Sequence, residues 1–118
     1  VNVSSAAGLV AAPLMSVYSA AKHGVIGLTK SAAAEYAKRG VRINSICPAF
    51  TKTAMVEGFF ENNEQDREKA IERLTQGIPM SRMAEVSEII VGILFVADPN
   101  NSFMTGNSIA IDGGLTAV

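Results

Sequence analysis

The chain has 118 residues, a net charge of −1 and 48% hydrophobic residues, which is enough for the core of one domain at most. Because no basic cluster accompanies this near-neutral charge, a nucleic-acid or anionic-lipid partner is not expected, and the longest apolar stretch, residues 89–97, is far shorter than the roughly 20 residues that span a membrane. A single cysteine, Cys47, excludes an internal disulfide and a cysteine-rich metal site and fits a reducing, cytoplasmic location.

The first predicted elements are a strand end and a long helix. Two β-branched valines indicate a strand within residues 1–5, and the small residues after it predict a loop over residues 6–15. Ser16 can cap a helix over about residues 17–38, which Gly40 would end.

Tyr18 and Lys22 lie four residues apart near the start of this helix. Residues at this spacing share a helix face, so the phenol and the ammonium are expected side by side. A nearby cation favours the phenolate and thereby suits the tyrosine to proton transfer. The alternative interpretation is an ordinary exposed pair, since the spacing alone is a weak signal.

The same helix is rich in small residues, which allow another backbone to approach closely. Either the sheet of the same chain or a helix of a partner could occupy this face, and we weigh the two equally. The small residues are Ala20, Ala21, Gly24, Gly27, Ala32, Ala33 and Ala34.

A second strand is predicted over residues 41–47, where apolar and polar residues alternate up to Pro48. Strand, helix and strand in this order predict a parallel crossover, the unit of a doubly wound α/β sheet. Ligands of such sheets bind beyond the carboxyl ends of the strands, which is where Ser5 and residues 48–53 fall.

The remaining residues predict two helices and a last strand. Residues 54–77 are largely polar and include a charged stretch typical of a solvated surface helix. A firmer helix is expected over residues 85–97, with an apolar stripe assigned to the core: Val86, Ile89, Ile90, Ile93 and Leu94. The final strand, residues 107–111, ends at Asp112-Gly113-Gly114.

Four motifs in this order resemble those of the short-chain dehydrogenase/reductase family, over essentially the whole chain. They read Asn2-Val3-Ser4-Ser5, Tyr18 to Lys22, Asn44-Ser45-Ile46-Cys47-Pro48-Ala49-Phe50-Thr51-Lys52-Thr53, and Asp112-Gly113-Gly114. Ala49 and Thr51 stand where the family usually has glycine and isoleucine or valine. Within the family, the sequence looks most similar to 3-oxoacyl-carrier-protein reductases and sugar-alcohol dehydrogenases.

The resemblance implies a Rossmann-like fold and hydride transfer between NAD or NADP and a secondary alcohol or ketone. Tyr18 would be the general acid or base, Lys22 would bind the nicotinamide ribose, and Ser5, thirteen residues before Tyr18, would hold the substrate oxygen. Ser4 is expected to make local backbone bonds instead. Residues 54–77 would form a substrate lid. The implied cofactor-binding residues are Tyr18, Lys22, Pro48, Ala49, Phe50, Thr51 and Thr53, and the implied substrate contacts are Ser5, Phe50, Met55 and Phe59.

The chain has no glycine-rich turn between a strand and a helix, which a nicotinamide enzyme of this type needs for the pyrophosphate. We therefore expect it to be the C-terminal, catalytic half of a longer protein, inactive by itself and forming a homodimer or homotetramer when complete. A rival hypothesis from another class is a catalytically inert fragment that acts only as a self-associating structural module.

Three further residues attract attention but are assigned structural roles. His23 has no companion ligand for a metal, so no metal site is predicted. Cys47 at a strand end is typical of a small buried apolar residue. Asp112, which precedes two glycines, is expected to support a turn.

Overall fold

The computed structural model describes residues 1–58 and 64–118. Its strands are β1 (Asn2–Val3), β2 (Ser45–Pro48) and β3 (Ser108–Ile111). Its α-helices are α1 (Ser16–Tyr36), α2 (Ala54–Glu57), α3 (Glu64–Thr75) and α4 (Val86–Ala97), and two short 3₁₀ helices are η1 (Ala6–Gly8) and η2 (Ala37–Arg39). Within the described residues, no helix is long and apolar enough to cross a membrane.

The three strands form one parallel sheet in the order β1-β2-β3, as predicted for this α/β class. The central strand is shorter than predicted: β2 begins at Ser45 rather than Val41 and extends through Pro48. Ser45, Ile46 and Cys47 are all buried, because helices cover both faces of the sheet and no face is left for polar side chains. The Ser45 hydroxyl is satisfied there by the Ser108 hydroxyl, 2.8 Å away.

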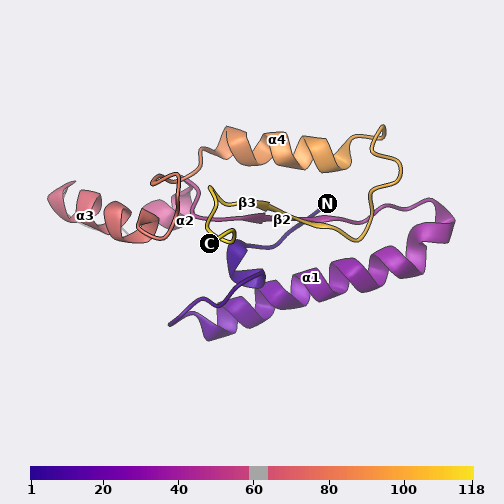
Figure 1. Ribbon diagram of the computed structural model, residues 1–118, viewed down its shortest axis with the longest axis horizontal. Helices are drawn as coiled ribbons and strands as arrows, with labels where there is room; N and C mark the ends of the chain where they lie inside the picture. Colours follow the sequence, from indigo (N-terminus) through magenta and orange to yellow (C-terminus); the bar gives the residue numbers. More distant parts are fainter. Residues whose placement is uncertain (59–63) are drawn as a thin grey trace.

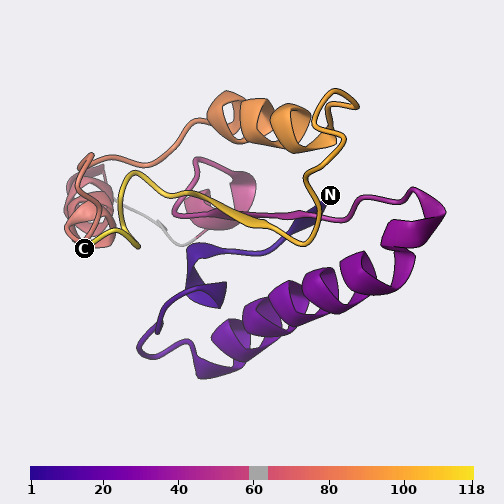
Figure 2. The same cartoon turned by 45° about the vertical axis from the view of Figure 1, so that its right-hand side comes forward.

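Helix α1 lies against one face of the sheet and α4 against the other (Figures 1 and 2). The predicted N-cap of α1 is wrong: Met15 occupies the N-cap position without a side-chain cap bond, and Ser16 is the first helical residue. The predicted end is confirmed, since η2 follows α1 directly and Gly40, with a φ of 75°, closes it in the left-handed conformation that glycine adopts readily.

The small residues of α1 point mostly away from the sheet. Ala33 is buried with Ile26 and Thr29, but Gly24 and Gly27 are exposed. A Cβ atom added at either glycine would meet no atom within 4 Å. Packing on the chain's own sheet therefore accounts for the small side chain at Ala33, but it leaves Gly24 and Gly27 exposed.

Helix α4 buries only part of its apolar surface. Its Ile89 and Val96 join Ile46 of β2 in the core, which includes the partly buried Ala84, Ile93, Met104, Ile109 and Ile111. The predicted core stripe is thus wrong for Val86, Ile90 and Leu94, which are exposed, Leu94 at 64%. A sheet of three strands is too narrow to cover a helix face this wide. The sequence pattern therefore correctly indicated that α4 has an apolar face, but not how much of that face the sheet buries.

Arg42 fixes the loop between α1 and β2 to the C-terminal end of α4. Its guanidinium donates to four backbone carbonyl oxygens, those of Val96, Ala97, Asp98 and Met104, at 3.0–3.3 Å. These bonds satisfy carbonyl groups that a helix end leaves without partners. Arg42 was predicted as a polar strand position, but it acts as a cap for a helix on the far face of the sheet.

Helices α2 and α3 lie beyond the carboxyl ends of the strands (Figure 1). The Arg67 guanidinium joins them through an ion pair with both carboxylate oxygens of Glu57, at 2.8 and 2.9 Å. Most described residues of α3 are exposed, in agreement with a surface helix.

Candidate active site

The carboxyl end of β1 carries two serines with different partners. Ser5 is the N-cap of η1, where its hydroxyl accepts from the Ala7 N–H at 3.2 Å and lies 3.5 Å from the Pro48 carbonyl oxygen at the end of β2. Ser4 is 3% exposed and donates to the Lys22 carbonyl oxygen at 2.8 Å, eighteen residues along the chain. The expectation that Ser4 makes local backbone bonds is therefore wrong, and the local bond belongs to Ser5.

Tyr18 and Lys22 lie side by side on the first turns of α1, as their spacing predicts. The Lys22 Nζ atom is 5.5 Å from the centre of the Tyr18 ring and donates to the Val3 carbonyl oxygen at 3.2 Å. Tyr18 is 38% exposed, so its ring can be reached from solvent.

Helix α1 is held against the end of β1 by hydrogen bonds from both elements. The Ser19 hydroxyl donates to the Ala7 carbonyl oxygen of η1 at 2.8 Å, beside the Lys22 bonds to β1. These contacts bring the Tyr18 turn, Ser5 and the end of β2 to one edge of the sheet. Of the predicted site, the structure thus gathers Ser5, Lys22 and Pro48 with the helix turn that carries Tyr18.

The segment after β2 is fixed by a parallel segment before α4. The Lys52 N–H donates to the Ala84 carbonyl oxygen and the Ala84 N–H to the Phe50 carbonyl oxygen, both at 2.9 Å. The Lys52 ammonium also pairs with the Glu85 carboxylate. Residues 50–52 therefore keep a fixed backbone path as they leave the sheet.

The two threonines predicted to bind cofactor differ in their bonding. The Thr51 hydroxyl donates to the Ala49 carbonyl oxygen at 3.2 Å. Thr53 is exposed at the N-cap of α2, and its hydroxyl has no hydrogen-bond partner among residues 1–58 and 64–118. Thr53 is thus the better placed of the two to bind an added group.

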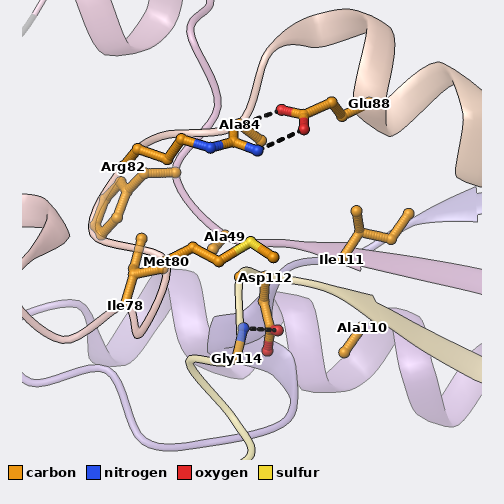
Figure 3. Close-up of a pocket in the computed structure, with 12 residues that line it drawn as sticks. Ala49, Ile78, Met80, Arg82, Ala84, Glu88, Ala110, Ile111, Asp112 and Gly114 are labelled. Atoms are coloured by element: carbon orange, nitrogen blue, oxygen red, sulfur yellow. Dashed lines mark hydrogen bonds and ion pairs between the residues drawn. The ribbon is translucent and has the colours of Figure 1, made fainter.

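A cavity of about 370 Å³ lies between the ends of β2 and β3 and the segment before α4. Mostly apolar residues line it, among them Phe50, Ile78, Met80 and Ile111. Figure 3 shows Met80 between the ion pair of Arg82 with Glu88 on one side and Asp112 on the other. Both Arg82–Glu88 contacts are 2.7 Å long.

Glu88 also belongs to a capping box that starts α4. Its carboxylate accepts from the Glu85 N–H at 2.8 Å, and the Glu85 side chain accepts in return from the Glu88 N–H. The hydrogen bonds from Arg82 and then from the Glu85 backbone lower the pKa of Glu88 to about 2. Such bonds favour the ionised carboxylate.

This shift predicts an acid-dependent contribution of Glu88 to stability. Because the pKa of Glu88 is lower in the folded state, its ionised carboxylate stabilises that state at pH values above the ordinary pKa of 4.5. This contribution is lost as the pH falls from 4.5 toward 2. At low salt, Glu88→Gln in the full-length protein is expected to lower the urea midpoint near pH 6, and the difference from wild type should vanish near pH 2. Glu35→Gln, an exposed carboxylate of α1, is the control. A difference independent of pH would contradict the role of the ion pair.

Each of the three residues assigned structural roles is buried or takes part in hydrogen bonds. Burial raises the pKa of the Cys47 thiol, which lies inside the sheet. Burial opposes ionisation of Asp112, but hydrogen bonds from Thr116 and Gly114 outweigh it and lower the pKa of this carboxyl, which supports the turn after β3. The His23 ring bonds to the Ser19 carbonyl oxygen of its own helix at 3.0 Å. In the part of the chain that the structure describes, no three side chains gather as a metal site.

The predicted substrate lid is described only in part. Met55 on α2 is 73% exposed, and its neighbour Val56 is buried instead. Phe59, predicted to contact substrate, and Phe60 lie outside the described residues. The described helices of this segment, α2 and α3, lie at the carboxyl edge of the sheet (Figure 1).

Sequence reasoning missed the ion pairs at the start of α4. Lys52, after β2, pairs with Glu85 at the N-cap of α4, and Arg82 pairs with Glu88 in its first turn; no helix or strand periodicity predicts either pair. One local signal was available, because Glu85 and Glu88 stand three residues apart just before an apolar helix, at the spacing of a capping box.

Comparisons with known proteins identify the family. A family model described as enoyl-(acyl carrier protein) reductase matches residues 1–116. The short-chain dehydrogenase srdC of Neurospora crassa is 40% identical over 116 residues, 98% of this chain and 41% of that protein. An A-factor type gamma-butyrolactone 1′-reductase of Streptomyces virginiae is 42% identical over 116 residues, 98% of this chain and 44% of that protein. The chain therefore belongs to the short-chain dehydrogenase/reductase family.

Solved structures give the same assignment for the fold. The ligand-free aldohexose dehydrogenase of Thermoplasma acidophilum has a TM-score of 0.91 at 35% identity, over 99% of this chain and 47% of that one. ElxO with NADP bound has a TM-score of 0.87 at 35% identity, and 4-hydroxyisoleucine dehydrogenase with NADH has 0.84 at 32%; this chain covers 46% of each and is itself covered to 99%. The fold is thus one half of a Rossmann-like parallel sheet, and the chain spans less than half the length of these relatives.

Proposed function

We propose that this chain is the catalytic half of an enzyme that transfers a hydride between NAD or NADP and a secondary alcohol or ketone. The observation that carries the proposal is the Tyr18–Lys22 pair, held at the carboxyl edge of the sheet beside Ser5. Family membership supports it, as do relatives solved with NADP and with NADH. The activity is proposed for a protein that joins this chain to a cofactor-binding half such as its relatives have.

The residues at this edge are proposed to have separate roles in the proton transfer. The Tyr18 hydroxyl gives a proton to the substrate oxygen during reduction and takes one during oxidation. The Lys22 ammonium stands 5.5 Å from the centre of the phenol ring, so a positive charge lies next to the proposed proton donor. The Ser5 hydroxyl, fixed at the end of β1, holds the substrate oxygen. The nicotinamide cofactor, when bound, supplies or accepts the hydride.

Unused hydrogen-bonding capacity at the same edge fits a nicotinamide ribose and carboxamide. Lys22 uses one of its three ammonium donors on Val3, which leaves two for ribose hydroxyls. The exposed Thr53 hydroxyl is available for the carboxamide or pyrophosphate. The residues proposed to hold the cofactor are Tyr18, Lys22, Pro48, Ala49, Phe50, Thr51 and Thr53.

The substrate is proposed to lie between this edge and residues 54–77, which would act as its lid. Phe50 lines the neighbouring cavity, and Met55 offers an exposed apolar side chain on α2. With Ser5 and Phe59, they form the proposed substrate contacts.

A second candidate function is self-association. The exposed Gly24 and Gly27 of α1 leave room for a helix of another copy, and α4 exposes Val91, Leu94 and Phe95. We propose a homodimer or homotetramer for the complete enzyme, and a self-associating module without catalysis as the alternative for this chain alone.

Replacement of Lys22 tests the proposed function. Lys22→Ala in the full-length protein should weaken NADH or NADPH binding about tenfold and lower kcat, because the proposed ribose contact and the cation beside Tyr18 are both lost. Lys30→Ala, an exposed lysine on the same helix, should change neither. The cofactor Kd from fluorescence titration and steady-state kinetics are the measurements. Unchanged values for Lys22→Ala would refute these roles of Lys22.

A further inference from the structure

We propose that Ser4 is a positioning residue for Lys22. Together with the Val3 carbonyl group and Gly8, it forms what we call the Lys22 clamp. This inference rests on the proposed function of Lys22 and adds residues for which the family motifs gave no such role.

Two consecutive residues, Val3 at the end of β1 and Ser4 directly after it, hold the two ends of the same lysine. The Val3 carbonyl oxygen accepts from the Lys22 ammonium at 3.2 Å, and the Ser4 hydroxyl donates to the Lys22 main-chain carbonyl at 2.8 Å. A bond at the main chain sets the position of the helix, and a bond at the ammonium sets the direction of the side chain. The lysine is therefore fixed relative to the end of β1, which Ser5 follows by two residues.

The strand side of the clamp is itself immobilised by the sheet. The Ser4 N–H donates to the Ile46 carbonyl oxygen of β2 at 2.8 Å. Ser4 is 3% exposed, so water does not compete for its hydroxyl. A buried donor with a good partner and a fixed backbone imposes a definite geometry on the group that it binds.

Gly8 is required for this close approach of η1, β1 and α1. A Cβ atom at Gly8 would lie 2.6 Å from the Ser4 Oγ atom and 2.8 Å from the Lys22 carbonyl oxygen. Both distances are too short, and the second is to a backbone atom that can move only with the helix. The space at Gly8 thus serves the Ser4–Lys22 bond directly.

The clamp explains how the proposed catalytic groups keep their relative positions. Ser5 follows Ser4 directly after β1, and Tyr18 precedes Lys22 by about one helical turn. The hydrogen bond between Ser4 and Lys22, together with those of Lys22 to Val3 and Ser19 to Ala7, therefore helps to set the spacing between the groups proposed to hold the substrate oxygen and to exchange its proton. Misplacement of such groups by about 1 Å can lower a rate about a hundredfold.

The test is a double-mutant cycle in the full-length protein, with NADH and NADPH as probes. Ser4→Ala is expected to raise the cofactor Kd about fivefold and to lower kcat about tenfold, in line with the loss of one buried hydrogen bond and a shifted lysine. In a Lys22→Ala background, Ser4→Ala should change the cofactor Kd by less than about twofold, because the Lys22 ammonium, which Ser4 is proposed to position for the cofactor, is absent. Ser45→Ala is the matched control, since it removes a buried hydroxyl of the adjacent strand that bonds to the Ser108 hydroxyl.

Two results would overturn the proposed clamp. One is an equal loss of kcat in Ser4→Ala and Ser45→Ala. The other is an undiminished effect of Ser4→Ala on the cofactor Kd in the Lys22→Ala background. If Ser4→Ala does not fold, Ser4→Cys keeps a weaker donor of similar size and should show a smaller loss of the same kind. These results are separable from failure of the proposed function, which Tyr18→Phe decides. Normal turnover by Tyr18→Phe would refute the role of Tyr18 as proton donor. The double-mutant cycle measures the cofactor Kd and therefore tests only the positioning of Lys22.

Discussion

Tyr18→Phe in the full-length protein is expected to lower kcat about a thousandfold and to leave the cofactor Kd nearly unchanged. The substitution removes only the hydroxyl that exchanges a proton with the substrate, and positioned proton transfer contributes about 10²–10⁴ to a rate. A thousandfold loss corresponds to about 4 kcal/mol in the activation barrier. Stopped-flow or steady-state kinetics with NAD(P)H, together with a fluorescence titration, measure the two quantities.

The chain provides a closely matched control for this experiment. Tyr36 lies on the same helix, is exposed at 40% and has a cation, Arg39, 5.2 Å from its ring centre. Tyr36→Phe therefore removes a similar hydroxyl beside a similar charge, but far along α1 from Ser5. A loss of less than about tenfold in Tyr18→Phe, or an equal loss in both variants, would refute the role of Tyr18.

The 118-residue chain by itself is expected to bind neither NAD(H) nor NADP(H) measurably. Its sequence has no glycine-rich turn leading into a helix, the element that brings backbone N–H groups to a pyrophosphate. Titration calorimetry of both cofactors against the isolated chain is the measurement. Saturable binding at micromolar cofactor would show that residues 1–118 suffice and would contradict this expectation.

The same preparation tests the self-associating alternative. Sedimentation velocity over a range of concentrations should show association of the isolated chain that Gly27→Glu weakens, because a charged side chain would enter the uncovered face of α1. Gln76→Glu adds the same charge at an exposed position outside α1. Equal sedimentation of the two variants would place the association surface elsewhere.

The sequence was most informative where a local signal and a tertiary contact agree. The end of α1 at Gly40 needs only a left-handed residue, and the bounds of α4 follow from its apolar run, so both were predicted closely, although the capping pair at Glu85 and Glu88 was missed. Tyr18 and Lys22 were placed together by helical spacing alone. The order strand, helix, strand then located the edge at which Ser5 and Pro48 meet.

The errors occurred where the deciding partner is distant in sequence. Ser4 was expected to bond locally, but its partner is Lys22, on the next helix. The stripe on α4 was assigned wholly to the core, whereas Val86, Ile90 and Leu94 extend past the width of three strands. A periodic pattern shows that a helix has an apolar side, and only the neighbouring elements decide how much of it is covered.

The four bonds of Arg42 have a mechanical consequence. They connect the loop after α1 to the end of α4, so the layers on opposite faces of the sheet are tied together at the end farthest from the candidate active site. At the other end, α2 and α3 lie beyond the carboxyl ends of the strands and are joined by the Glu57–Arg67 ion pair (Figure 1). We therefore expect the two layers to be held most firmly at the Arg42 end, and any relative movement to occur at the end where α2 and α3 lie.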